Sequence, residues 1–163
     1  MTPGAWCLVA YTAIATVPLV RTDLREHRLP NRWTLAGWLV ALGAIGIDWM
    51  WLGAFPVTMA VAGGVALAVF GLLAAVAGLG MGDVKLAVPL AVGLGSFSMD
   101  AVLAAGLLAF VLGGLAAIVL LCRGRNRDTE IAFGPFLLAG YWICIAGVLL
   151  GAAVPAGQLA GLD

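Results

Sequence analysis

The stretch Gly78-Leu79-Gly80-Met81-Gly82-Asp83-Val84-Lys85-Leu86 breaks the longest apolar part of the chain and places a carboxylate close to an ammonium group. Around it, the chain is 64% hydrophobic and only 10% charged. A charge is costly near hydrocarbon, so an ionisable residue at such a break is a candidate for function. Glycine lacks Cβ and lets backbone approach backbone or substrate closely, which suits an aspartate that must meet a peptide.

Apolar segments extend in both directions from this break. They cover about 4–20, 33–47, 55–77, 84–97, 101–121 and 134–154 of the 163 residues. A mean hydropathy of +1.14 lies far outside the range of soluble proteins. We therefore expect an all-α integral membrane protein, a single polytopic domain over 1–163 folded as a bundle of six transmembrane helices. The fourth segment is short for a bilayer core of ~30 Å and contains Pro89, so it borrows loop residues or crosses where the bilayer is thinned.

The basic residues gather on one side of this predicted topology. All 8 Lys and Arg residues fall in the first, third and fifth loops: Arg21, Arg25, Arg28, Arg32, Lys85, Arg123, Arg125 and Arg127. By the positive-inside rule these loops are cytoplasmic. We expect a multi-pass protein of the cell (inner) membrane, with lipid as its surroundings and both termini outside.

Two carboxylates meet at this cytoplasmic rim. Asp23 follows the first predicted span and Asp83 precedes the fourth, so the bundle brings them together although they are far apart in sequence. Two carboxyl groups in one small site do not both ionise cheaply, so one stays protonated. The ionised one acts as general base on a water, and the protonated one polarises a carbonyl and protonates the leaving amine. This is the chemistry of an aspartic protease, and it needs no metal or cofactor.

Other sites are disfavoured by composition. The cysteines Cys7, Cys122 and Cys144 are far apart and His27 is the one histidine, which argues against a structural zinc site. The formal net charge is zero and there is no long basic run, which argues against a nucleic-acid partner. Each aspartate also has a non-catalytic interpretation. Asp83 is a helix-capping residue in this interpretation, and Asp23 is a solvated charge in a loop.

Three segments together resemble one known family. Asp23-Leu24-Arg25-Glu26-His27-Arg28-Leu29-Pro30-Asn31 is similar to the Asp-x5-(Ile/Leu)-Pro-(Asn/Asp) motif of the type IV prepilin peptidases. Gly80-Met81-Gly82-Asp83-Val84-Lys85-Leu86 matches the family's second motif, the Gly-x-Gly-Asp segment. Phe133-Gly134-Pro135-Phe136 resembles a third, Pro-Phe-Gly-Pro-Phe, with Ala132 replacing its first proline. All three occur in the family's order, so the resemblance covers nearly the whole chain.

This resemblance implies that Asp23 and Asp83 are the catalytic pair of an endopeptidase. It would remove the short basic leader of a type IV pilin-like precursor at the cytoplasmic face. The long members of the family also carry paired Cys-x-x-Cys motifs and N-methylate the product; these motifs are absent here, so cleavage without methylation is expected. The short form resembles the peptidases of Flp-type (tight adherence) pili more than archaeal preflagellin peptidases.

The remaining candidate residues are expected either to support this site or to contact the substrate. Motif residues expected to support the active site are Gly80, Gly82, Lys85, Pro30, Asn31, Gly134 and Pro135. Acidic residues expected to contact a basic leader are Glu26, Asp128 and Glu130. Two other functions stay open: a non-catalytic transporter or pilus-assembly subunit, and a Gly-x-Gly-Asp intramembrane protease of broader specificity. The oligomeric state is not predicted.

Overall fold

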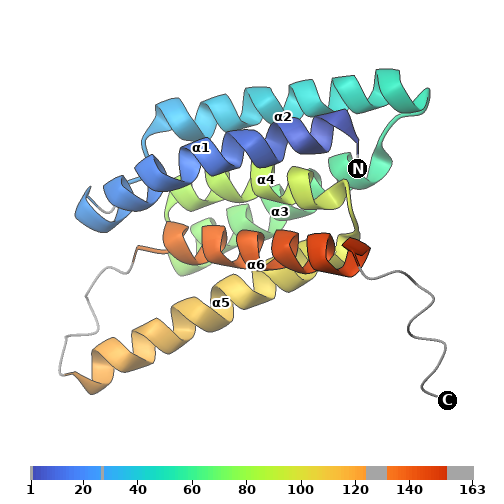
Figure 1. The fold of residues 1–163 in the computed structure, drawn as a ribbon. Helices are drawn as coiled ribbons and strands as arrows, with labels where there is room; N and C mark the ends of the chain where they lie inside the picture. Colours follow the sequence, from blue (N-terminus) through green and yellow to red (C-terminus); the bar gives the residue numbers. More distant parts are fainter. Residues whose placement is uncertain (1, 27, 124–131, 154–163) are drawn as a thin grey trace, which may run out of the picture.

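The computed structural model describes residues 2–26, 28–123 and 132–153, and these residues form a bundle of helices (Figure 1). The helices are α1 (Pro3–Glu26), α2 (Asn31–Leu52), α3 (Val57–Ala77), α4 (Met81–Gly95), α5 (Met99–Cys122) and α6 (Gly134–Ala153). Successive helices alternate in direction (Figure 1). One end of the bundle therefore holds the basic residues of the described part, and we call it the basic end: Arg21, Arg25, Arg28, Arg32, Lys85 and Arg123.

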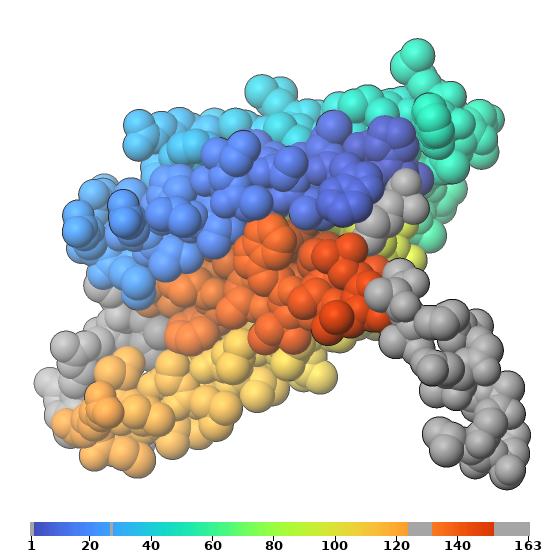
Figure 2. All heavy atoms as spheres, in the orientation of Figure 1, coloured from blue at the N-terminus to red at the C-terminus, as the bar shows by residue number. Residues whose placement is uncertain are grey.

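Helix α4 is the centre of the bundle. It contacts each of the other five helices, and every residue from Asp83 to Gly95 except Lys85 is buried. On the face shown in Figure 2, α6 lies between α1 and α5, and little of α4 is visible behind them. The other helices therefore shield α4 from the surroundings.

Five helices are long and apolar enough to cross a membrane: α1, α2, α3, α5 and α6. The predicted all-helical fold is confirmed, and five of the six expected spans have the length and composition needed to cross a membrane. The fourth segment, α4, has only 15 residues and does not meet the length of a span. Its apolar residues pack against protein, so it needs no full layer of lipid around it. Large apolar side chains on the outer faces of the other helices are exposed, as expected for surfaces that face lipid.

The first helix is longer than the sequence pattern predicted. The expected span ended at Val20, with Asp23 in a loop, but α1 continues to Glu26 and includes Asp23. The extension contains no glycine or proline, and leucine, arginine and glutamate are good helix formers. Because Asp23 is on a helix, its side chain has a fixed direction, and it is buried.

Gly78, Leu79 and Gly80 connect α3 to α4 in a tight turn between antiparallel helices. Gly78 ends α3 with φ 71°, a left-handed conformation that favours glycine. Close packing of the two helices also depends on glycine: a Cβ on Gly63 would lie 2.7 Å from Val92 Cγ2, and one on Gly95 would lie 2.7 Å from Ala62 Cβ. These contacts fix α4, and the residues at its start, against α3.

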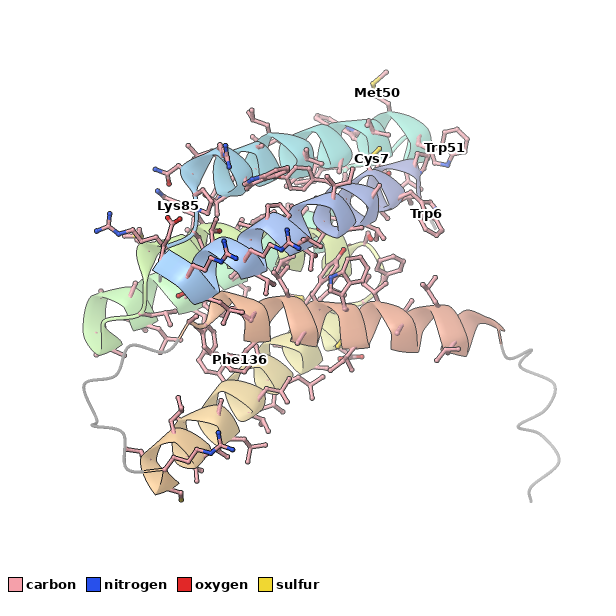
Figure 3. The ribbon with its side chains drawn as sticks, turned by 60° about the vertical axis from the view of Figure 1, so that its left-hand side comes forward. Trp6, Cys7, Met50, Trp51, Lys85 and Phe136 are labelled. Atoms are coloured by element: carbon pink, nitrogen blue, oxygen red, sulfur yellow. The ribbon has the colours of Figure 1, made fainter. Side chains whose placement is uncertain are left out.

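At the opposite end of the bundle, a carboxylate of α2 caps α1. Asp48 is fully buried and accepts hydrogen bonds from the Gly4 N–H at 2.8 Å and from Thr2 Oγ1 at 2.5 Å. Figure 3 places Trp6 and Trp51 at this same end and Lys85 at the other. Asp48 therefore satisfies a first-turn amide of α1 that has no partner within its own helix.

We expect Asp48→Ala to lower the free energy of unfolding by about 1–3 kcal/mol, because it leaves the buried Gly4 N–H without its acceptor. The measurement is reversible unfolding in mixed detergent micelles. Asp100→Ala is the matched control, because Asp100 is an exposed carboxylate in the first turn of α5 at the same end. Equal destabilisation by the two variants would contradict the capping role.

Candidate active site

Asp23 lies one turn before the end of α1, at the basic end, and its side chain is only 5% exposed. Its Oδ2 accepts a hydrogen bond of 3.0 Å from the backbone N–H of Gly134, the first residue of α6. A Cβ on Gly134 would lie 2.6 Å from the same oxygen, closer than side-chain carbons approach in real structures. A side chain at position 134 would therefore displace either the Asp23 carboxylate or the start of α6.

Asp83 lies in the first turn of α4, and its side chain is 8% exposed. The residue that caps this helix is Gly80, and no side-chain hydrogen bond caps it. Asp83 is thus not the N-cap residue, although as the acidic residue of the first turn it lies at the positive end of the helix. A Cβ on Gly80 would lie 3.0 Å from Asp83 Oδ2, so the glycine leaves room for the carboxylate.

The two carboxyl groups are close enough to affect one another. Burial, together with the smaller effect of the nearby charge of Asp23, raises the pKa of Asp83 to about 7. Asp83 is outside the five helices long enough to cross a membrane. Near neutral pH, Asp83 therefore holds its proton far more readily than an exposed aspartate, as the chemistry of a carboxyl pair requires.

Leu29 lies between the starts of α4 and α6, and it was not among the residues expected to support the site. A Cβ on Gly82 would lie 3.0 Å from Leu29 Cβ, and one on Gly134 would lie 3.3 Å from Leu29 Cδ2. Gly82 and Gly134 thus face the same leucine from α4 and α6. An apolar residue in an arginine-rich stretch was the signal that could have revealed this contact.

Two other motif residues meet beside the pair. Lys85 Nζ donates a hydrogen bond of 3.0 Å to Oδ1 of Asn31, the first residue of α2. Pro30 precedes this helix in an extended conformation, and Pro135 is the second residue of α6. Both prolines stand at helix starts. The ammonium group of Lys85 is thus fixed to α2 rather than free.

Of the three residues expected to contact a basic leader, the structure describes only Glu26. Glu26 is exposed at the last position of α1, and Asp128 and Glu130 lie outside the described residues. Within residues 2–26, 28–123 and 132–153, no group of three or more His, Cys, Asp or Glu side chains is arranged to hold a metal ion.

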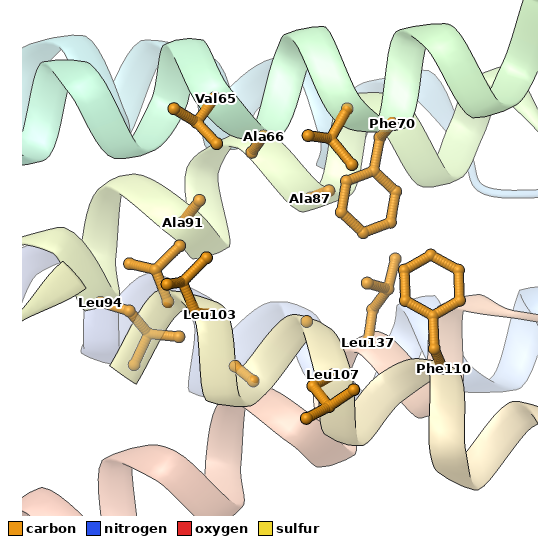
Figure 4. A pocket seen from close by; sticks show the side chains of 14 residues that line it. Val65, Ala66, Phe70, Ala87, Ala91, Leu94, Leu103, Leu107, Phe110 and Leu137 are labelled. Atoms are coloured by element: carbon orange, nitrogen blue, oxygen red, sulfur yellow. The ribbon is translucent and has the colours of Figure 1, made fainter. Parts of the chain in front are cut away.

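An apolar cavity of about 300 Å³ opens between α3 and α5 (Figure 4). Its lining contains no ionisable side chain, so it has no acid or base for catalysis. Phe70 and Phe110 stack beside it with ring centroids 5.7 Å apart, and Phe110 lies 5.2 Å from the ring of Phe133. Phe133 directly precedes Gly134, so this row of aromatic rings extends from the cavity to the start of α6.

The sequence model described as the type IV leader peptidase family matches residues 8–120. This range includes Asp23, Asp83 and the whole of α2, α3 and α4, but it ends before Gly134. No curated protein and no solved structure matches the chain with significant similarity. The match covers more than half of the chain and agrees with the resemblance carried by the sequence motifs.

Proposed function

Because the chain belongs to the type IV leader peptidase family, we propose that it is an aspartic endopeptidase with Asp23 and Asp83 as its catalytic pair. The observation that carries this proposal is the burial of both carboxyl groups at one end of the bundle, where the charge of Asp23 acts on Asp83. Buried, interacting carboxyl groups of this kind are typical of catalytic sites.

The surroundings of the two residues suggest different roles. Asp23 accepts the Gly134 N–H at the start of α6, where the helix dipole favours a negative charge. We therefore assign the ionised state, and the role of general base, to Asp23. Asp83 has the raised pKa and serves as the general acid. No assigned role needs a metal or an organic cofactor.

In the proposed reaction, Asp23 takes a proton from a water whose oxygen attacks the carbonyl carbon of the scissile peptide. Asp83 donates its proton to the carbonyl oxygen as the tetrahedral intermediate forms. The C–N bond then breaks as the proton held by Asp23 passes to the leaving amine. Asp83 takes back a proton from one hydroxyl of the intermediate, which leaves the carboxylic acid and restores both residues. The products are a carboxylic acid and a free amine, and water is the only molecule consumed besides the peptide.

The proposed substrate is the precursor of a type IV pilin-like protein, cut after its short basic leader and left without an N-methyl group. The basic end would face the cytoplasm by the positive-inside rule, with both termini outside and residues 1–163 acting as a single domain in the inner membrane. Glu26, Asp128 and Glu130 remain proposed contacts for the basic leader. Gly80 and Gly82 would hold the cleaved segment extended, since a helical segment presents no free carbonyl.

The structure favours this function over transport. A transporter would place an ionisable residue near the middle of the membrane. In the described part of the five long helices, the ionisable Asp, Glu, Lys and Arg residues lie near helix ends instead. A broader intramembrane protease would share the carboxyl pair and would differ in the substrates it cuts.

Cleavage should fall as the pH rises through about 7, because the general acid Asp83 then loses its proton. Since the pKa is raised, the active protonated form prevails below this value and disappears above it. The check is kcat for a leader peptide between pH 5 and pH 9. A rate that stays constant from pH 6 to pH 9 would show that Asp83 does not donate the proton.

The proposal itself is tested by expressing the protein together with an epitope-tagged pilin-like precursor from the same genome. Loss of the leader, seen as a shorter precursor on a gel, supports leader peptidase activity. An intact precursor beside correctly inserted protein argues for the transporter or assembly alternative. Cleavage of unrelated membrane segments as well would indicate the broader protease.

A further inference from the structure

Pro89 leaves a backbone oxygen of α4 without its usual partner. In a regular α-helix, the N–H of residue 89 would donate to the carbonyl oxygen of Lys85, four residues earlier. Proline has no N–H, so Pro89 makes no such bond. The helix nevertheless continues without interruption from Met81 to Gly95. The Lys85 carbonyl therefore needs a donor from outside α4.

Trp38 of α2 supplies that donor. Its indole N–H lies 2.9 Å from the Lys85 carbonyl oxygen. The approach of the two helices is matched to this contact: a Cβ on Gly37 would lie 3.2 Å from Pro89 Cγ, so the proline ring fits against a position without a side chain. The proline, the glycine beside it and the tryptophan thus form one unit between α2 and α4.

This unit lies next to the catalytic pair. Asp83 and Lys85 belong to the first turns of α4, and Lys85 is held twice by α2: through its side chain by Asn31 at 3.0 Å and through its carbonyl by Trp38 at 2.9 Å. A shift of the freed carbonyl would turn the start of α4 and move the Asp83 carboxyl group. Catalysis is sensitive to displacements of about 1 Å.

We propose that Trp38 is a positioning residue, whose indole N–H replaces the amide donor lost at Pro89 and thereby holds Asp83 in place beside Asp23. The predicted effect of Trp38 on catalysis rests on the proposed peptidase function. The hydrogen bond itself is independent of that function.

The test is a double-variant cycle on the full-length protein. Trp38→Phe keeps an aromatic ring but removes the donor, and we expect kcat for a leader peptide to fall about tenfold with KM unchanged. Pro89→Ala restores an N–H at residue 89 that bonds to the Lys85 carbonyl within α4. In the Trp38→Phe/Pro89→Ala double variant, kcat should return to within about twofold of the Pro89→Ala value, because the tryptophan donor is then dispensable.

Trp33→Phe is the matched control, since it makes the same change in the same helix. The Trp33 indole N–H is buried and has no hydrogen-bond partner among the described residues. We expect its effect on kcat to be under twofold, and we expect Pro89→Ala not to alter it. A double variant that stays as slow as Trp38→Phe would overturn the proposal, and so would a Trp33→Phe defect as large as that of Trp38→Phe.

Thermal unfolding of the same variants in detergent gives a second readout that needs no activity. The proposed bond predicts that Trp38→Phe lowers Tm and that Pro89→Ala removes most of this decrease. If the wild type cleaves no precursor, the proposed function fails while Tm still decides the bond. Additive effects of the two substitutions on Tm would refute it.

Discussion

Asp23→Asn and Asp83→Asn should each lower the rate of leader cleavage by about 10³-fold or more, as expected when one member of a catalytic pair is removed. Asparagine is nearly the same size as aspartate but neither accepts nor donates the proton in the reaction. Loss of Asp23 removes the base, and loss of Asp83 removes the acid. The double variant should be no slower than either single variant, because the two residues act as a unit.

The decisive control is the stability of these variants. Asp83 has a pKa of about 7 in the folded protein against 3.8 for an unperturbed group. The folded protein therefore loses stability as the pH rises from 3.8 to about 7, because Asp83 must then ionise in a buried site. At pH 8, Asp83→Asn should therefore unfold at the same temperature as the wild type or at a higher one, although it is inactive. Asp100→Asn changes an exposed carboxylate at the opposite end and should keep full activity. Substantial cleavage by either Asp23→Asn or Asp83→Asn would remove the basis for a carboxyl pair.

Gly134→Ala should have the second largest effect, lowering kcat by about 10²-fold. The added Cβ would lie 2.6 Å from Asp23 Oδ2 and 3.3 Å from Leu29 Cδ2. Either the carboxylate or the start of α6 must then move, and the hydrogen bond of 3.0 Å between them is lost or bent. The measurement is kcat and KM with a leader peptide, and the larger change is expected in kcat.

Gly147→Ala provides the comparison for this variant. Gly147 is in the same helix, but a Cβ at that position would meet nothing within 4 Å. The same substitution there should leave activity and Tm close to the wild-type values. If Gly134→Ala also cleaves at the wild-type rate, the contact between Asp23 and the start of α6 has no part in catalysis.

Much of the architecture was predictable because hydropathy and charge are local properties of the sequence. Long apolar segments predicted five of the helices, and the loop positions of the basic residues predicted the end of the bundle that those in the described part share. The end of α1 was predicted wrongly because charged residues look like a loop in a hydropathy pattern. In the structure, Arg21 and Glu26 are exposed on the same helix whose Asp23 faces inward.

The contacts around the pair could not be predicted in the same way. The motif resemblance identified Asp23, Asp83 and Gly134, but the bond from the Gly134 N–H to Asp23 depends on how α6 packs against α1. The proline in α4 was visible as a helix irregularity, whereas its compensation by Trp38 depends on the register of α2 against α4. Such pairings join distant parts of the chain, and local patterns do not specify them.

If Asp23 and Asp83 hydrolyse the leader peptide bond of a pilin-like precursor, the purified protein and precursor should suffice for cleavage. The most direct measurement is mass spectrometry of the products after purified, lipid-reconstituted protein is incubated with a purified precursor. We expect two fragments, the leader and a mature chain with a free, unmethylated N-terminus, whose masses sum to the precursor plus one water. An uncut precursor beside folded wild-type protein, or identical fragments from Asp23→Asn/Asp83→Asn, would contradict it.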